Sequence, residues 1–313
     1  MRRMTRAWAL WSPVALLCCS VAFGQGGFSF AVVGDAPYNY QEEGEFTAML
    51  ERIGQEDLAF VIHVGDFKSG SSPCSDPVFR QRRELLDASR RPLIYTPGDN
   101  EWTDCHRASA GSHDPLERLR KLRALFFAEG RSLGRKTLPL LRQSEADGKH
   151  SAYSENAMWD YGGVLFVTLN VPGSNNNFGR TPEMDREYRQ RGEANRTWLA
   201  RAFRRAEEES LEGVVVAMQA DPLFELEPSH PRRTGYGELL AQLAQQARAY
   251  GKSVLLIHGD SHRYRHDRPL ADPATGRSLA NLARLETFGS PVVGWVKVIV
   301  DPSHPGLFLP ESH

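Results

Sequence analysis

Short apolar runs that alternate with amphipathic stretches dominate the sequence. The runs are rich in β-branched and other apolar residues, and they have the length expected of buried strands. They cover Phe28–Val33, Ala59–Val64, Leu93–Thr96, Val164–Asn170, Val214–Met218, Ser253–His258 and Val292–Val300. The stretches between several of these runs carry apolar residues at helical spacing. This alternation predicts an α/β fold with parallel strand pairing.

Helix signals agree with the same pattern. The predicted helices cover Glu42–Ile53, Leu116–Phe126, Ala194–Glu209 and Glu238–Tyr250. Asp114 and Pro115 are a typical N-cap and first residue for the second helix, whose helical spacing persists up to Gly130. Gly251 is a typical C-cap for the last helix.

Four of the predicted strands end in the same pair of residues. The pairs are Gly34-Asp35, Gly65-Asp66, Gly98-Asp99 and Gly259-Asp260. Gly-Asp pairs are common in turns, so one pair alone means little. Open α/β sheets, however, bind their ligands at the carboxyl ends of their strands. Four strand ends that each deliver a carboxylate therefore predict a shared acidic pocket.

The first residues have the sequence features of a targeting signal. Three arginines precede a mostly apolar run from Ala7 to Phe23, and Ala22-Phe23-Gly24 offers small residues where a signal peptidase cuts. A membrane anchor is the alternative, but the run is interrupted and shorter than the roughly 20 residues that a span needs. We therefore expect a signal peptide over residues 1–24, one domain over residues 25–313, and a periplasmic or secreted protein without a membrane span.

The charge of the chain excludes one class of function. The sequence has 38 Lys and Arg residues against 39 Asp and Glu residues, and its net charge of −1 becomes more negative once the arginines of the signal are removed. A strongly basic nucleic-acid binder is therefore excluded. No low-complexity linker and no internal repeat divides the chain, and no pattern in it indicates an oligomeric state.

Two cysteines remain after the signal. Cys74 and Cys105 lie a few residues after the Gly-Asp turns of Asp66 and Asp99, respectively. An even number of cysteines in an oxidising compartment favours a disulfide over two free thiols. We therefore expect a bridge between Cys74 and Cys105, provided that the two turns lie side by side.

In their order and spacing, the strand ends resemble those of the calcineurin-like metallophosphoesterases. That family carries five signatures after successive strands: Asp-x-His, Gly-Asp-x-x-Asp, Gly-Asn-His-Asp/Glu, a lone His and Gly-His-x-His. The corresponding segments here are Gly34-Asp35-Ala36-Pro37, Gly65-Asp66-Phe67-Lys68-Ser69, Gly98-Asp99-Asn100-Glu101, Met218-Gln219 and Gly259-Asp260-Ser261-His262. The resemblance covers nearly the whole chain after the signal. It implies a sandwich of two mixed β-sheets flanked by α-helices.

The resemblance also implies ligands for a first metal ion and a bridge to a second. Asp35 and His262 would bind the first metal, and Asp66 would contact both. Pro37 stands near the position of the family's remaining first-site histidine and cannot replace it as a ligand. A site with one metal is therefore an alternative to a site with two.

The ligands implied for the second metal differ in type from those of the family. Asp99 stands at the position of an asparagine ligand, whereas Gln219 and Asp260 stand at the positions of histidine ligands. The whole set would then hold four carboxylates, one amide and one imidazole. Such an oxygen-rich set suits Mg²⁺ or Mn²⁺ better than Zn²⁺. Without a cation, the converging carboxylates would repel one another.

The position of the family's catalytic histidine is occupied by Asn100. An amide can donate a hydrogen bond to a phosphate, but it cannot deliver a proton at neutral pH. His106 lies in the loop after the third Gly-Asp turn, and His258 directly precedes the fourth. Both are candidates for the missing acid, although a buried histidine bonded to the backbone is the alternative for His258.

These features predict metal-dependent hydrolysis of a phosphoester in a small-molecule or phosphorylated substrate. The alternative is an exported relative that binds a metal and a phosphate-bearing ligand without turnover, which the replaced histidines favour. A serine esterase, suggested by Gly259-Asp260-Ser261, fits poorly, because those enzymes carry this motif near the mature N-terminus and no Gly-x-Ser-x-Gly elbow occurs here.

Overall fold

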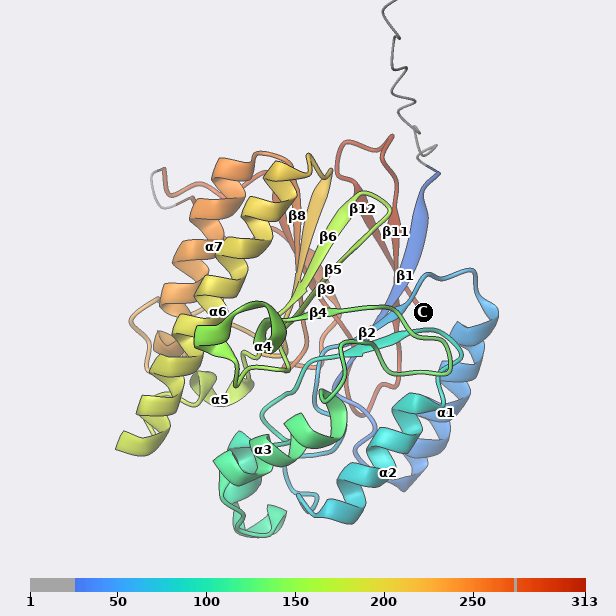
Figure 1. The fold of residues 1–313 in the computed structure, drawn as a ribbon, viewed down its shortest axis with the longest axis vertical. Helices are drawn as coiled ribbons and strands as arrows, with labels where there is room; N and C mark the ends of the chain where they lie inside the picture. The colour runs from blue at the N-terminus through green and yellow to red at the C-terminus, as the bar shows by residue number, and fades with distance from the viewer. Residues whose placement is uncertain (1–25, 273–274) are drawn as a thin grey trace, which may run out of the picture.

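Two β-sheets and the helices that cover them make up the described chain (Figure 1), which comprises residues 26–272 and 275–313 of a computed structural model. The five-stranded sheet has the order β12 (Phe308–Ser312), β11 (Val296–Val300), β1 (Phe28–Val33), β2 (Val61–His63) and β3 (Leu93–Tyr95). The seven-stranded sheet has the order β4 (Leu141–Arg142), β5 (Ala157–Tyr161), β6 (Val164–Thr168), β7 (Gly213–Ala217), β8 (Ser253–His258), β10 (Leu282–Glu286) and β9 (Arg265–Asp267). The predicted signal peptide lies outside the described residues.

Both sheets are mixed. The central strands β1, β2 and β3 pair in parallel, as do β6, β7, β8 and β10. The outer strands β11, β12, β5 and β9 add to these cores in antiparallel fashion. The parallel pairing predicted from the sequence is therefore confirmed for the strands that carry the Gly-Asp turns, and the mixed sandwich implied by the resemblance is confirmed for the sheets as a whole.

The helices cover the outer faces of the sandwich. Figure 1 shows α6 (Pro182–Glu208) and α7 (Gly237–Tyr250) on one side, and α1 (Tyr40–Gln55), α2 (Asp76–Asp87) and α3 (Pro115–Phe126) on the other. Shorter segments are α4 (Gln143–Ala146), α5 (Gly173–Asn176), η1 (Thr103–His106), η2 (Ala108–Ala110), η3 (Gly148–His150) and η4 (Thr234–Tyr236). Within the described residues, no helix is long and apolar enough to cross a membrane.

Buried strands show why their sequence reads as a continuous apolar run. Side chains alternate between the two faces of a strand, and both faces of these sheets are covered. In β1, Phe30 and Val32 point into the core between the sheets, whereas Ala31 and Val33 pack against the helices of the α1 side. Burial on both faces therefore favours apolar residues at successive positions of the strand.

Helix α6 begins well before the predicted helix at Ala194. Thr181 caps it by accepting a hydrogen bond from the backbone N–H of Met184, and Pro182 occupies the first turn. The residues before Ala194 are mostly polar, and few of them are buried. The apolar stripe that marks a helix in sequence is therefore absent from its first turns.

Strand β10 and helix α2 were not expected from the sequence. In β10, Arg284 and Glu286 are buried and alternate with apolar residues, so the run lacks the continuous apolar character of the other central strands. The predicted strand Val292–Val300 was too long, because the regular pairing of β11 starts only at Val296.

Candidate metal centre

Four aspartates meet at the carboxyl ends of the parallel strands, as the sequence predicted. Asp35, Asp66 and Asp99 follow β1, β2 and β3, which are neighbours in one sheet, and Asp260 follows β8 of the other sheet. Carboxylate oxygens of Asp66, Asp99 and Asp260 lie within 4.8 Å of one another. The backbone N–H of Asp260 is 3.0 Å from both carboxylate oxygens of Asp35. The two sheets therefore contribute to one acidic site.

The glycine of one Gly-Asp turn makes room for the aspartate of another. A Cβ atom on Gly98 would stand 2.0 Å from Oδ1 of Asp66, and one on Gly259 would stand 2.0 Å from Oδ2 of Asp35. Any larger residue would displace these carboxylates. The repeated pair in the sequence thus reflects the close approach of the turns.

Backbone strain is concentrated in the same place. Asp35, Asp66, Asp260 and His262 have φ angles of 51°, 56°, 79° and 61°, which lie in the left-handed region that residues other than glycine rarely adopt. Each such residue costs on the order of 1–3 kcal/mol, and strain of this kind gathers at functional sites. The fold therefore holds these four side chains in fixed directions.

A disulfide joins the loops behind two of the aspartates, as predicted. Cys74 and Cys105 form the bond with a Cα–Cα distance of 5.7 Å. It links the segment after β2 to the segment after β3. The turns of Asp66 and Asp99 are thus held side by side by a covalent bond as well as by the pairing of their strands.

The four aspartates form no ion pair with a lysine or arginine in the described residues. Within the same residues, their single ion pair is between Asp35 and His262, at 3.8 Å. Burial, followed by the charge of another aspartate, raises the pKa of Asp35, Asp66 and Asp99 well above the usual value. Burial also raises the pKa of Asp260 to about 7. A cation bound among them would reverse these shifts.

His262 directs its Nε2 toward the site. Its Nδ1 lies 2.6 Å from the carbonyl oxygen of Ser290. A carbonyl only accepts hydrogen bonds, so Nδ1 carries a proton, and in the neutral ring the lone pair is then on Nε2. Nε2 faces Asp35, and a backbone carbonyl that fixes the other nitrogen is the usual arrangement of a metal-binding histidine.

Gln219 turns its amide nitrogen, and not its oxygen, toward the aspartates. The backbone N–H of Gly173 donates to Gln219 Oε1 over 2.6 Å, which determines the orientation of the amide. Gln219 Nε2 then donates to Asp66 and Asp260, at 3.2 Å each. An amide nitrogen offers no lone pair to a metal. The implied role of Gln219 as a ligand would require its amide to rotate and lose the hydrogen bond from Gly173.

Asn100 lies directly against Asp66. Its side-chain Nδ2 donates to Asp66 Oδ2 over 2.8 Å, and its backbone N–H donates to Asp66 Oδ1 over 3.1 Å. These bonds orient both oxygens of the carboxylate. Asn100 is therefore within reach of a ligand bound at the site, although it cannot act as an acid.

The two candidate histidine acids lie apart from the aspartates. His106 is exposed, and its Nδ1 contacts the carbonyl oxygen of Thr103. His258 is completely buried, donates from Nδ1 to the carbonyl oxygen of Gly259, and has no partner at Nε2. Neither ring forms a hydrogen bond or ion pair with Asp35, Asp66, Asp99 or Asp260 in the described part of the chain. Burial lowers the pKa of His258, which keeps the ring neutral.

Two residues that the sequence did not predict as ligands or catalytic groups also contact the aspartates. The hydroxyl of Tyr38 lies 3.3 Å from Asp66 Oδ2 and 3.3 Å from His262 Nε2. The hydroxyl of Ser174 donates to Asp99 Oδ2 over 2.7 Å. Tyr38 follows Asp35 by three residues, and Ser174 lies in a stretch rich in turn-forming residues, so only their positions offered a signal.

The segment that carries Ser174 has an unusual backbone. Four consecutive residues, Ser174 to Asn177, have φ angles of 52°, 55°, 57° and 64°, which form a left-handed turn. Such a conformation costs roughly 1–2 kcal/mol per residue. The buried guanidinium of Arg191 holds the turn by donating to Oδ1 and to the carbonyl oxygen of Asn176, at 2.6 and 3.0 Å. The strained turn places the N–H of Gly173 and the hydroxyl of Ser174 at the site.

Space for a ligand lies beside the aspartates. A pocket of about 430 Å³ is lined by Asp99 and Asp260 at one end and by Ser174, Tyr236 and Arg232, among others. It therefore combines the acidic site with an aromatic ring and a cationic side chain.

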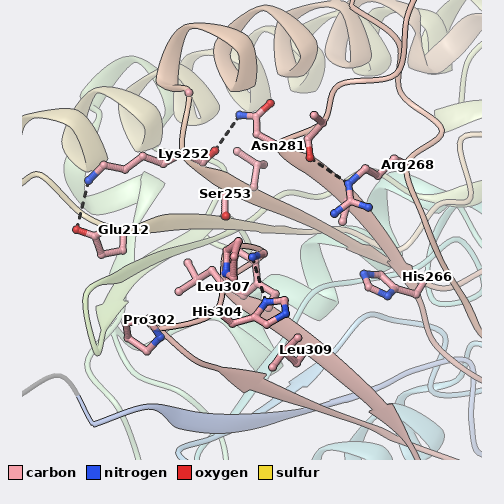
Figure 2. A pocket seen from close by; sticks show the side chains of 17 residues that line it. Glu212, Lys252, Ser253, His266, Arg268, Asn281, Pro302, His304, Leu307 and Leu309 are labelled. Carbon is pink, nitrogen blue, oxygen red and sulfur yellow. Dashed lines mark hydrogen bonds and ion pairs between the residues drawn. The ribbon is translucent and has the colours of Figure 1, made fainter.

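A second pocket, of about 850 Å³, has a different location (Figure 2). Ser253 and Asn281 line it at the amino ends of β8 and β10, and Lys252 pairs there with Glu212 over 3.4 Å. The Gly-Asp turns are at the opposite, carboxyl ends of the parallel strands, where α/β sheets bind their ligands. The pocket in Figure 2 is thus separate from the acidic site.

Comparison with known proteins identifies the fold. No protein-family model and no curated protein matches the sequence. Among solved structures, PhoD matches with a TM-score of 0.55 and 15% identity, over 88% of this chain and 64% of PhoD. A dimetal phosphatase from Danio rerio matches with a TM-score of 0.51 and 13% identity, over 91% of this chain and 98% of its own. A purple acid phosphatase from yellow lupin (Lupinus luteus) seeds matches with a TM-score of 0.51 and 13% identity, over 92% of this chain and 51% of the lupin enzyme.

These matches define the class of structure. The protein has the calcineurin-like metallophosphoesterase fold, as the resemblance in the sequence implied. At such identities the likeness is one of fold alone, and the chain spans less than two thirds of PhoD and about half of the lupin enzyme. What the site does must therefore be argued from its own residues.

Proposed function

We propose that this protein is a metal-dependent phosphoester hydrolase. The observation that carries the proposal is the convergence of four aspartates and His262 at strand ends without a counterion from the described chain. A divalent cation held there would polarise a phosphate oxygen and lower the pKa of a water molecule, which are the two requirements of phosphoester hydrolysis. Because most of the donors are carboxylates, we expect Mg²⁺ or Mn²⁺ to serve better than Zn²⁺.

The positions of the aspartates support either one or two cations. Asp66 is central, because it accepts hydrogen bonds from Tyr38 on the side of His262 and from Gln219 on the side of Asp260. Asp35 and His262 would hold a first ion together with Asp66, whereas Asp99 and Asp260 would hold a second.

The neutral donors of the site would contact the substrate. Asn100 Nδ2, Gln219 Nε2 and Ser174 Oγ now donate to carboxylates. Once those carboxylates bind a cation, the same N–H and O–H groups can turn to the phosphate oxygens that enter the site. They would orient the phosphate and balance part of its charge.

The leaving group would depart without a proton from the protein. Asn100 cannot supply one, and His106 and His258 make no contact with the aspartates in the described part of the chain. We therefore expect faster turnover of aryl phosphates, whose leaving groups are stable as anions, than of alkyl phosphates.

A panel of phosphomonoesters and phosphodiesters, assayed with Mg²⁺, Mn²⁺, Ca²⁺ and Zn²⁺, tests the proposal. We expect turnover that depends on the metal and that Asp66→Ala reduces by on the order of a thousandfold or more, because both cation positions lose a ligand. Glu225→Gln is the control, since Glu225 is an acidic residue outside the site. A protein that binds metal but hydrolyses no ester above the uncatalysed rate would contradict the proposal.

That outcome would favour a second function, the binding of a metal and a phosphate-bearing ligand without turnover. The replacement of the family's acid by Asn100 and the donor orientation of Gln219 are the observations in its favour. For either function we propose an exported protein, which the Cys74–Cys105 disulfide supports, because disulfides persist in oxidising compartments.

A further inference from the structure

The hydroxyl of Tyr38 lies beside two of the residues proposed for the first cation, Asp66 and His262. It lies 3.3 Å from Asp66 Oδ2 and 3.3 Å from His262 Nε2, and His262 Nε2 lies 3.8 Å from Asp35 Oδ1. The hydroxyl also accepts a hydrogen bond from Asn100 Nδ2 over 3.1 Å. We propose that Tyr38 is a metal ligand that completes the position formed by Asp35, Asp66 and His262. This inference rests on the metal-binding part of the proposed function.

The spacing of these atoms fits a shared cation. Oxygen and nitrogen ligands about 2.1 Å from a metal are roughly 3.0–3.4 Å from one another in octahedral or tetrahedral geometry. The distances from the Tyr38 hydroxyl to Asp66 and His262 fall in this range, and the distance from His262 to Asp35 is slightly longer. These three distances are therefore compatible with ligands of one shared ion.

The buried carboxylate of Glu42 helps to hold both Tyr38 and His262 in place. Glu42 accepts a hydrogen bond from the backbone N–H of Tyr38 over 2.7 Å and another from the hydroxyl of Ser290 over 2.7 Å. The carbonyl oxygen of Ser290 in turn accepts the bond from His262 Nδ1 over 2.6 Å. Glu42 is 4% exposed, so water does not compete for these bonds. Tyr38 and His262 are therefore positioned together.

Two buried tyrosines, Tyr95 and Tyr236, show what a purely structural hydroxyl looks like. The hydroxyl of Tyr95 donates to Glu101 Oε1, and that of Tyr236 donates to the carbonyl oxygen of Pro172. Neither contacts Asp35, Asp66 or His262 in the described residues. The hydroxyl of Tyr38 alone among these three lies among the proposed ligands. When it binds a cation as phenolate, its proton passes to solvent.

Ferric ion gives a direct readout of a phenolate ligand, because an iron(III) phenolate absorbs visible light through charge transfer. We expect purified protein loaded with Fe³⁺ to show this band, Tyr40→Phe to retain it and Tyr38→Phe to lose it. Tyr40 is the matched control, because it lies two residues away and is 90% exposed. Titration calorimetry with Mn²⁺ should show that Tyr38→Phe weakens binding by about 10-fold or more.

Each outcome decides the inference. A band that persists in Tyr38→Phe, or its absence from wild-type protein that holds Fe³⁺, would overturn it. If the protein takes up no Fe³⁺, equal Mn²⁺ affinity of wild type and Tyr38→Phe would also overturn it. A band that depends on Tyr38 in a protein without esterase activity would support the ligand and contradict the hydrolase. Full activity with unchanged Mn²⁺ affinity in Tyr38→Phe would support the hydrolase and contradict the role of Tyr38 as a ligand.

Discussion

Two acidic clusters lie next to each other in this protein. Within the part of the chain that the structure describes, one is paired with an arginine, and the other is not. In one, Arg265 pairs with Asp221 over 2.8 Å, with Glu225 over 2.6 Å and with the completely buried Glu286. In the other, the four aspartates of the candidate metal centre have no lysine or arginine partner in the described residues. The clusters touch, because the backbone N–H of Asp221 donates to Asp260 over 3.0 Å.

The titration behaviour of the two clusters differs accordingly. Burial lowers the pKa of Arg265, but the hydrogen bond to Glu286 and the charges around it outweigh burial and raise that pKa well above its usual value. Among the aspartates, the pKa of the carboxyl groups themselves is raised. A cluster that contains its own cation stabilises the charged form, whereas a cluster without one stores repulsion that an external cation can relieve. The comparison therefore predicts which cluster binds metal.

Metal removal should produce the largest difference between the clusters. At a free Mn²⁺ concentration about 100 times the dissociation constant, binding stabilises the folded state by about 3 kcal/mol. We expect a chelator to lower the free energy of unfolding by that amount at pH 8, as measured by urea denaturation. An unchanged unfolding curve would mean that the aspartates hold no ion.

The pH dependence of the metal-free protein follows from the same shifts. A carboxyl whose pKa is higher in the folded state stabilises the fold below the unfolded pKa of 3.8, and this contribution is lost as the pH rises through the folded pKa, about 7 for Asp260. We therefore expect the metal-free protein to lose stability as the pH rises from about 4 to about 7. Saturating Mn²⁺ should remove most of this slope, and a slope of the same size with metal would contradict the account.

Removal of the internal cation should be nearly as costly as removal of the metal. Arg265→Met leaves Glu286 and Asp221 buried without their partner, which should destabilise the fold by about 3 kcal/mol. Urea denaturation at pH 8 measures the loss. Arg268→Met is the control, because Arg268 is exposed and, within the described residues, donates to the carbonyl oxygen of Ala280 and to no carboxylate. Equal stability of the two variants would refute the assigned role of Arg265.

Neutralising one carboxylate should change the stability of the metal-free protein in opposite directions in the two clusters. Asp99→Asn relieves repulsion and should stabilise the metal-free protein at pH 8 by about 1–2 kcal/mol, whereas Glu286→Gln weakens the pairing with Arg265 and should destabilise it by a similar amount. Thermal unfolding of both variants in chelator measures the signs. The same sign for both would show that the clusters do not differ as proposed.

The smallest effect concerns the leaving group. Asn100→His restores the residue type that the family has at this position, next to Asp66. If it protonates the leaving oxygen, the ratio of alkyl to aryl phosphate turnover should rise about tenfold, a part of what a general acid typically contributes. Steady-state kinetics on one ester of each type measures this ratio, and a ratio that stays constant would place the acid elsewhere.

The sequence predicted most of the elements that position the site. The predicted strands Phe28–Val33 and Ser253–His258 match β1 and β8 at both ends, because burial on both faces makes them continuous apolar runs. The predicted caps Asp114 and Gly251 bound α3 and α7 through local side-chain or backbone preferences. The elements that were missed or shortened, such as β10 and the start of α6, contain polar residues whose burial or exposure depends on distant partners.

The composition of the site could also be predicted, but not the direction of its side chains. The four Gly-Asp turns signalled the aspartates, since the requirement for glycine and the strand end are both local. The orientation of Gln219 depends on Gly173, which is 46 residues away in the chain. The place of Tyr38 depends on Glu42 and on Asp66. The contacts of Gln219 with Gly173 and of Tyr38 with Asp66 have no local signal, because the partners are far apart in the chain.

The sequence by itself determined that the chain forms an α/β fold with carboxylates at successive strand ends, because strand periodicity, turn residues and caps act over a few neighbouring residues. Only the tertiary structure decided which acidic residues remain without a counterion. Asp260 and Asp221 are both acidic residues near strand ends, yet Arg265 pairs with Asp221 and not with Asp260. The physical reason is that electrostatic energy depends on distances between side chains from both sheets, and these distances exist only once the sheets have packed together.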